Sequence, residues 1–216
     1  MPTLLVSVEE IYRQFIEGIQ RTSWLEFIAV VTGIASVWFS KMENIWVYPV
    51  GIINTVIYIC LSVEGHLYGE ASVNLYYTIM SVYGWILWAR KDEQRENLLS
   101  VKFSSRKEWL SQVVFFCVFY IALYAALSFL KANFTSGAIP WADALASATA
   151  YTGMWLMARK KVESWYWWIA TDIASIPLYF VKGYVFTSFY YGVLLVLAII
   201  GLRAWIKKSN IVKRQQ

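Results

Sequence analysis

Charged side chains are scarce in this sequence. Asp, Glu, Lys and Arg make up only 15% of its 216 residues, whereas a soluble domain carries about 25%. A soluble protein needs charged groups over its surface, so the shortage excludes an ordinary soluble enzyme. Hydrophobic residues make up 59% of the chain and its mean hydropathy is +0.49. These values exclude intrinsic disorder as well.

Residues that bind metals or perform catalysis are also few. The sequence has one histidine, His66, and two cysteines, Cys60 and Cys117. A structural zinc site needs about four Cys or His ligands, so no metal site is expected. The chain has no Gly-x-x-x-x-Gly-Lys-Ser/Thr phosphate loop, and one histidine supports no nucleophile–base array. We therefore expect neither an enzyme nor a bound cofactor.

Aromatic residues, in contrast, are abundant. Twelve Trp, fifteen Tyr and twelve Phe make up 18% of the chain, and Trp and Tyr favour the membrane–water interface. The net charge of +5 comes from Lys and Arg in short connections and in the C-terminal tail. This placement is typical of cytoplasmic loops of membrane proteins, so it favours a bilayer over a nucleic acid as the partner.

Apolar stretches long enough to cross about 30 Å of hydrocarbon recur along the chain. They predict an all-α integral membrane protein with seven transmembrane helices at residues 24–40, 45–63, 71–89, 109–130, 138–157, 165–181 and 186–205. Residues 1–23 contain an amphipathic helix that lies on the membrane or on the bundle. The Lys and Arg bias of the connections places the N-terminus outside and the C-terminus in the cytoplasm.

The spans also repeat. Trp24 and Trp88 bracket the first three spans with the same spacing at which Trp141 and Trp205 bracket the last three. Between these pairs Gly65 matches Gly183, and Trp46 roughly matches Trp165. Chance placement of interfacial Trp is the alternative. The repeat predicts a 3+1+3 parallel arrangement: a three-helix unit at 24–89, a cytoplasmic loop and linker helix at 90–137, a second unit at 138–205 and a basic cytoplasmic tail at 206–216.

Asp172 lies near the middle of the sixth span, where a charge is costly unless it is paired or faces a cavity. Trp165, Trp168 and Asp172 share one helix face. No basic residue lies at a comparable depth in any span, so we interpret this face as a ligand site. The alternative makes the two Trp interfacial anchors and Asp172 the partner of a Lys or Arg. Two indoles and a carboxylate suit an aromatic cation.

Polar residues on other spans are further candidates for the same site: Asn54, Asn74, Tyr77 and Tyr151. Hydrogen bonding between transmembrane helices is the alternative role for such residues. For Glu70 and Asp143, which lie near helix ends, we expect interfacial solvation instead.

The run Trp165-Tyr166-Trp167-Trp168-Ile169-Ala170-Thr171-Asp172, together with the 3+1+3 arrangement, resembles the PnuC family of vitamin transporters. The resemblance extends from Trp24 to Trp205, and the pattern WxxWxxx(N/D) is its most specific part. It implies a SWEET-like fold and a homotrimer in the bacterial inner membrane. It also implies facilitated diffusion of a vitamin that a cytoplasmic kinase phosphorylates and so traps.

One residue departs from the pattern of the nicotinamide riboside branch, where the last motif position is typically Asn. Here that position is Asp172, and a carboxylate suits the aminopyrimidine of thiamine. This residue favours the thiamine-transporting branch, PnuT. A nicotinamide riboside transporter is the alternative within the family. A membrane-embedded vitamin-binding sensor or scaffold without transport is the alternative from another class.

Overall fold

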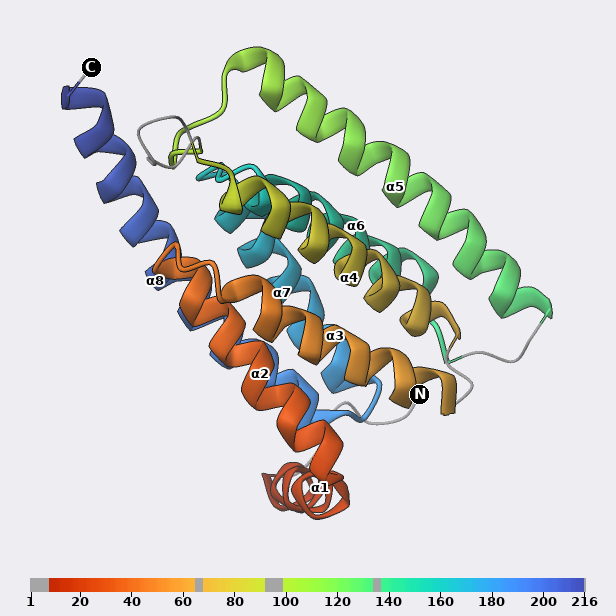
Figure 1. Cartoon of the computed structure of the whole chain (residues 1–216). Coiled ribbons are helices and arrows are strands. Elements are labelled where there is room, and N and C mark those ends of the chain that lie inside the picture. The colour runs from red at the N-terminus through yellow and green to blue at the C-terminus, as the bar shows by residue number, and fades with distance from the viewer. Residues whose placement is uncertain (1–7, 65–67, 92–98, 134–136, 216) are drawn as a thin grey trace.

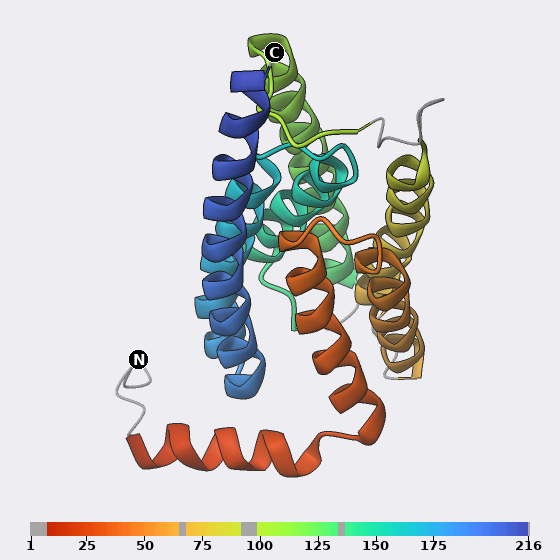
Figure 2. The same ribbon diagram turned by 60° about the vertical axis from the view of Figure 1, so that its left-hand side comes forward.

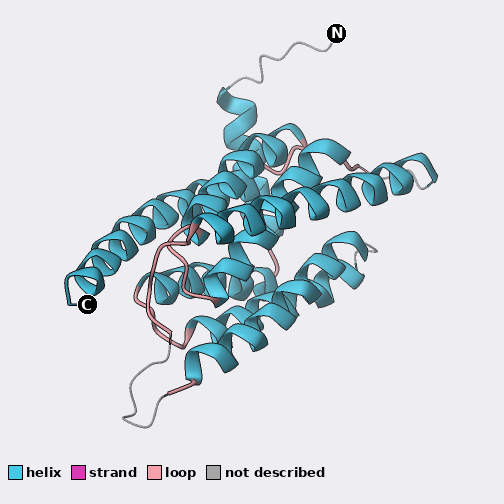
Figure 3. Ribbon diagram, turned by 90° about the horizontal axis from the view of Figure 1, so that it is seen from above, coloured by secondary structure: helices cyan, strands magenta, loops and turns pink. Residues whose placement is uncertain are grey.

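The computed structural model describes residues 8–64, 68–91, 99–133 and 137–215. Within these ranges the chain is all-α, and its helices are joined by loops (Figures 1 and 3). The helices are α1 (Val8–Arg21), α2 (Trp24–Lys41), α3 (Val47–Glu64), α4 (Tyr68–Ala89), α5 (Arg106–Asn133), α6 (Pro140–Ala158), α7 (Ser164–Val181) and α8 (Val185–Gln215).

Helices α2 to α8 closely match the seven predicted spans, and α1 is the predicted amphipathic helix. The largest difference is at the C-terminus, where α8 continues past residue 205 to Gln215. By length and hydropathy alone, four helices in the described ranges qualify as membrane spans: α2, α3, α5 and α8. Helix α6 is enclosed by α4, α5 and α7, so its composition need not match that of lipid.

Six helices form a closed ring in which each packs against the next, in the order α2, α3, α4, α6, α7, α8 and back to α2. Helix α5 packs outside the ring against α6 (Figure 1). Helix α1 packs against α8 and lies across one end of the bundle (Figure 2). Within the ring, the set of packed pairs is unchanged when α2, α3 and α4 are exchanged with α6, α7 and α8.

Side-chain contacts at one end of the bundle are also equivalent in the two three-helix units. The indole of Trp88 on α4 donates a hydrogen bond to the backbone oxygen of Ala158 at 3.2 Å. The indole of Trp205 on α8 donates to the backbone oxygen of Ser40 at 3.1 Å. Each three-helix unit therefore supplies a donor for a carbonyl at the end of the other unit's first helix, α6 or α2.

A second ring packs on each of these indoles. Tyr48 lies edge-on to Trp88 with ring centroids 5.1 Å apart, and Trp165 lies edge-on to Trp205 at 5.6 Å. Tyr48 covers Gly84 and Trp165 covers Gly201, where a Cβ atom would overlap the ring in either case. We call Tyr48, Trp88, Trp165 and Trp205 the aromatic junction; all four belong to the larger hydrophobic core cluster of the described residues.

The sequence match between Trp46 and Trp165 is wrong. Trp46 is 58% exposed whereas Trp165 is 1% exposed, and the residue that takes the place of Trp165 in the first unit is Tyr48. Matching Trp to Trp was misleading because the junction needs a buried flat ring at this position, and Tyr supplies one as well as Trp does. Gly65, the proposed match of Gly183, lies outside the described residues.

We predict that Gly201→Ala lowers the melting temperature of the protein in detergent. The added methyl group would overlap the buried ring of Trp165, and overpacking of this kind costs about 1–3 kcal/mol. Gly192→Ala on the same helix is the control, because nothing lies within 4 Å of its added methyl group and Ala is the better helix former. Equal melting temperatures for the two variants would contradict this packing.

Candidate functional site

Helix α7 turns its predicted face toward the other helices. Asp172 and Ser175 are 3% and 1% exposed, whereas Tyr166 and Ile173 on the opposite face are 40% and 57% exposed. Helical periodicity accounts for this division, because residues three or four apart lie on one side of a helix. The face proposed from the sequence is therefore the buried one.

Three phenols lie within electrostatic range of the side chain of Asp172. They belong to Tyr77 of α4 and to Tyr190 and Tyr191 of α8. Within the described ranges the structure records no hydrogen bond and no ion pair to this carboxylate. The alternative role of Asp172, as the partner of a Lys or Arg, is therefore not supported in that part of the chain.

Trp168 lies against α4 and α6. Its indole covers Gly153 of α6, where an added Cβ would lie 3.2–3.3 Å from the ring. The centroid of its ring is 6.3 Å from that of Tyr77. Gly153 therefore makes room for the indole at a point where any other residue would crowd it.

Tyr151 of α6 completes this group of rings. It lies edge-on to Tyr77 with centroids 6.0 Å apart, and it stacks on Tyr76 at 4.1 Å. The hydroxyl of Tyr76 donates to the backbone oxygen of Tyr151 at 3.2 Å. Four predicted site residues are thus brought together. With the two tyrosines of α8 they form what we call the central site: Tyr77, Tyr151, Trp168, Asp172, Tyr190 and Tyr191.

The two predicted asparagines lie on α3 and α4, which are neighbours in the ring. The Asn54 amide donates to the backbone oxygen of Ala29 at 2.6 Å and so links α3 to α2. This is the alternative role considered for Asn54, a hydrogen bond between transmembrane helices. The Asn54 amide also borders Gly33, where a Cβ atom would meet the hydroxyl of Tyr190. Asn74 lies on α4, and its backbone oxygen accepts a bond from the Thr78 hydroxyl at 2.9 Å.

Trp165 belongs to a different cluster. Its ring packs in the aromatic junction, two helical turns before Asp172 along α7. Its indole N–H is buried and has no hydrogen-bond partner in the described part of the chain. The structure thus separates the two Trp of the motif: Trp168 lies in the central site, and Trp165 lies at the aromatic junction with an unused donor.

Sequence reasoning missed Tyr76, Tyr190 and Tyr191. All three are tyrosines within predicted spans, which is the only signal that marks them. The phenols of α8 were not considered because they form no polar stripe with neighbouring residues. Their approach to Asp172 depends on how α8 packs against α7, and periodicity along one helix contains no such information.

Of the two residues predicted to be solvated at helix ends, Asp143 differs from expectation. The carboxylate of Asp143 accepts a bond from the backbone nitrogen of Ile139 at 2.7 Å and pairs with Lys182 at 2.6 Å. It therefore caps α6 and links α6 to α7, since its carboxylate is within reach of both. The side chain of Glu70 lies outside the described residues.

We predict opposite effects on stability for two substitutions of Asp by Asn. Asp143→Asn lowers the melting temperature because it removes a charged hydrogen-bonding partner of Lys182, a loss of about 1–3 kcal/mol. Asp172→Asn leaves the melting temperature unchanged or raises it, because no bonded partner is lost and a carboxylate costly to bury is removed. Destabilisation by Asp172→Asn comparable to that of Asp143→Asn would indicate a structural role for Asp172.

Known proteins resemble this chain over most of its length. Residues 23–207 match the family model described as nicotinamide mononucleotide transporter. The riboflavin/roseoflavin transporter RibM of Streptomyces davaonensis is 26% identical over 88% of each chain. The nicotinamide riboside transporter PnuC of Escherichia coli is 24% identical over 87% of each chain.

A solved structure agrees with the fold. The crystal structure of the vitamin B3 transporter PnuC superposes with a TM-score of 0.69 at 24% sequence identity, and the match covers 93% of this chain and 88% of that one. The resemblance read from the motif of α7 is confirmed at the level of the family. The chain belongs to the nicotinamide mononucleotide transporter family, to which PnuC also belongs.

Proposed function

We propose that this protein carries an aromatic, cationic vitamin, most favourably thiamine, across the bacterial inner membrane by facilitated diffusion. The observation that carries the proposal is the carboxylate of Asp172, which is buried among phenols at the middle of α7 with no cation bonded to it in the described ranges. Family membership supports transport, and the carboxylate supports preference for a cation.

The ring of six helices supports the predicted 3+1+3 repeat, with units at 24–89 and 138–205. Its packed pairs are unchanged when the units are exchanged, as a parallel repeat requires. Transporters built from repeats bind substrate near the midplane, between the repeats. The central site fits this plan because its side chains come from both units: Tyr77 from the first and Trp168 and Asp172 from the second.

The chemistry of the central site suits a flat cation. Trp168 and Tyr77 offer ring faces for stacking and for cation–π attraction. Asp172 accepts a hydrogen bond from the amine of an aminopyrimidine, and one from its ring nitrogen when that nitrogen is protonated, and it balances the charge of the thiazolium. Tyr151, Asn54 and Asn74 complete the proposed site, and Trp165 offers its unpaired indole N–H from the junction side.

Nicotinamide riboside is the second candidate. The relatives named PnuC are nicotinamide riboside transporters, and the pyridinium ring of that vitamin is also a flat cation. The relative RibM is named as a riboflavin/roseoflavin transporter. Riboflavin is neutral and larger, so the carboxylate of Asp172 would not favour its binding. Asp rather than Asn at position 172 is what favours thiamine over nicotinamide riboside.

The direction of uptake belongs to the same proposal. The turn between α6 and α7 carries Arg159, Lys160 and Lys161, and α8 ends in a basic segment. We assign this end to the cytoplasm, which leaves the N-terminus outside. A cytoplasmic kinase that phosphorylates the vitamin would make uptake directional, and we expect a homotrimer with one path in each protomer.

We predict that thiamine quenches the Trp fluorescence of the purified protein saturably and more tightly than nicotinamide riboside or riboflavin. Asp172→Asn weakens thiamine binding at least about tenfold, because a charged hydrogen bond is lost. The same variant leaves riboflavin binding unchanged, since riboflavin carries no cation. Undiminished thiamine affinity in Asp172→Asn would remove Asp172 from the site, and tighter binding of nicotinamide riboside would reassign the substrate.

We further predict that Trp168→Ala weakens thiamine binding by about tenfold, through loss of a stacking face worth about 0.5–1.5 kcal/mol and of its buried area. Trp46→Ala is the matched control, because Trp46 is 58% exposed and lies outside the central site. Isothermal titration calorimetry measures both variants. Equal affinities would show that Trp168 packs against Gly153 without contacting substrate.

A further inference from the structure

Two loops at the same end of the bundle have the same unusual backbone conformation. Glu43 follows α2 and Lys160 follows α6, and each has φ of 52°. The amide of Glu43 bonds to the backbone oxygen of Ser40, and that of Lys160 bonds to the backbone oxygen of Met157, both at 3.0 Å. These are Schellman turns, in which the left-handed position is usually Gly.

Glycine does occupy that position in a third turn. Gly183 follows α7 with φ of 82°, and its amide bonds to the backbone oxygen of Phe180. A residue other than Gly is strained in this conformation, and such strain clusters at functional positions. Glu43 and Lys160 therefore occupy positions where the backbone conformation alone would favour Gly.

Those two side chains bind each other. The ammonium of Lys160 lies 3.3 Å from the Glu43 carboxylate, and their side chains are 4% and 9% exposed. The other carboxylate oxygen of Glu43 pairs with Lys208 at 2.7 Å, and the side chain of Lys208 is 55% exposed. Burial lowers the pKa of Lys160, and the charge of Glu43 opposes that shift. The pair joins the first unit to the second.

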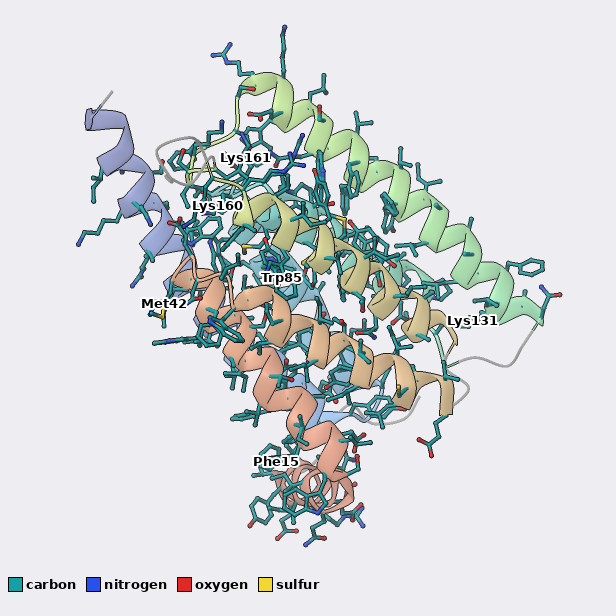
Figure 4. The ribbon with its side chains drawn as sticks, in the orientation of Figure 1. Phe15, Met42, Trp85, Lys131, Lys160 and Lys161 are labelled. Carbon is teal, nitrogen blue, oxygen red and sulfur yellow. The ribbon has the colours of Figure 1, made fainter. Side chains whose placement is uncertain are left out.

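The pair also lies directly on the aromatic junction. The Lys160 ammonium is 4.6 Å from the ring centroid of Trp88, and Trp88 is 6.3 Å from Trp205. Figure 4 shows Lys160 at the end of the bundle where α2 terminates near Met42, away from Phe15 at the other end. The charge pair and the indoles together form a packed layer between the units at this end.

A buried ion pair is weak evidence for stability, because desolvation offsets the attraction, and its best-attested use is to fix one of several arrangements. We propose that Glu43 and Lys160 form a latch between the two units that closes the cytoplasmic end of the substrate path and separates when substrate leaves. The latch rests on the proposed function, since a path between the units is what it closes.

The latch can be tested by labelling a cysteine placed behind it. Ser40→Cys is the reporter, because Ser40 is 3% exposed and its backbone oxygen accepts the bond from Trp205. Cys60 and Cys117 are exposed, so both are first replaced by Ala. The full-length protein in detergent is treated with a charged maleimide, and the rate of modification is measured.

Glu43→Gln is expected to raise the labelling rate at least about tenfold, and Lys160→Gln to do the same. The charge-swapped variant Glu43→Lys/Lys160→Glu/Lys208→Glu restores both pairs of residue 43 with the signs reversed and returns the rate to within about threefold of the parent. Glu43→Gly keeps the turn but removes the carboxylate, so it labels as fast as Glu43→Gln. Asp143→Asn, which breaks an ion pair within the second unit near the start of α6, leaves the rate unchanged.

Parent-like labelling of Glu43→Gln and Lys160→Gln would overturn the latch, and so would fast labelling of the charge-swapped variant. Parent-like labelling of Glu43→Gly would also overturn it, because the turn and not the charge would then hold this end closed. Thiamine titration of the parent protein tests the proposed function separately. If the parent binds thiamine but Glu43→Gln is labelled as slowly as the parent, the latch is refuted and the proposed function is not.

Discussion

Two indole–carbonyl hydrogen bonds hold the ring of helices closed: Trp88 to Ala158 and Trp205 to Ser40. Carbonyls at the end of a helix have no partner within it, and lipid offers none. Each three-helix unit supplies an indole donor to the other: Trp88 to the carbonyl of Ala158, and Trp205 to the carbonyl of Ser40, which also accepts a bond from the Glu43 amide. The buried rings of Tyr48 and Trp165, over Gly84 and Gly201, set the spacing of α3 from α4 and of α7 from α8 within each unit. The central-site residues of α4, α7 and α8 lie on the helices that these contacts position.

The units are alike at this end and different in the middle of the bundle. In the second unit α7 presents Trp168 over Gly153 and the carboxylate of Asp172. In the first unit α3 presents Gly51, whose added Cβ would lie 3.1 Å from the hydroxyl of Ser36. Shared contacts therefore build the frame, whereas Trp168 and Asp172 of the proposed site occur in the second unit alone. Under the proposed function, this asymmetry would let the site distinguish the faces and the charge of a flat ligand.

Much of the fold could be predicted from the sequence, because helix length, amphipathicity and the buried face of α7 follow from periodicity. Asp172 could be singled out since a carboxylate in an apolar span needs an explanation. Neither the approach of Tyr190 and Tyr191 nor the separation of Trp165 from Trp168 could be predicted, because both depend on packing between helices. Tyr48 escaped notice for a related reason, as Tyr and Trp fill the same buried position.

Under the proposed function, a vitamin crosses the membrane between the two units. Counterflow in proteoliposomes preloaded with unlabelled thiamine tests it most directly, with no ion gradient and no nucleotide supplied. Facilitated diffusion predicts that external labelled thiamine accumulates transiently inside and then returns to equilibrium. Saturable binding of thiamine without any such accumulation would contradict transport and would make the protein a membrane-embedded receptor for its ligand.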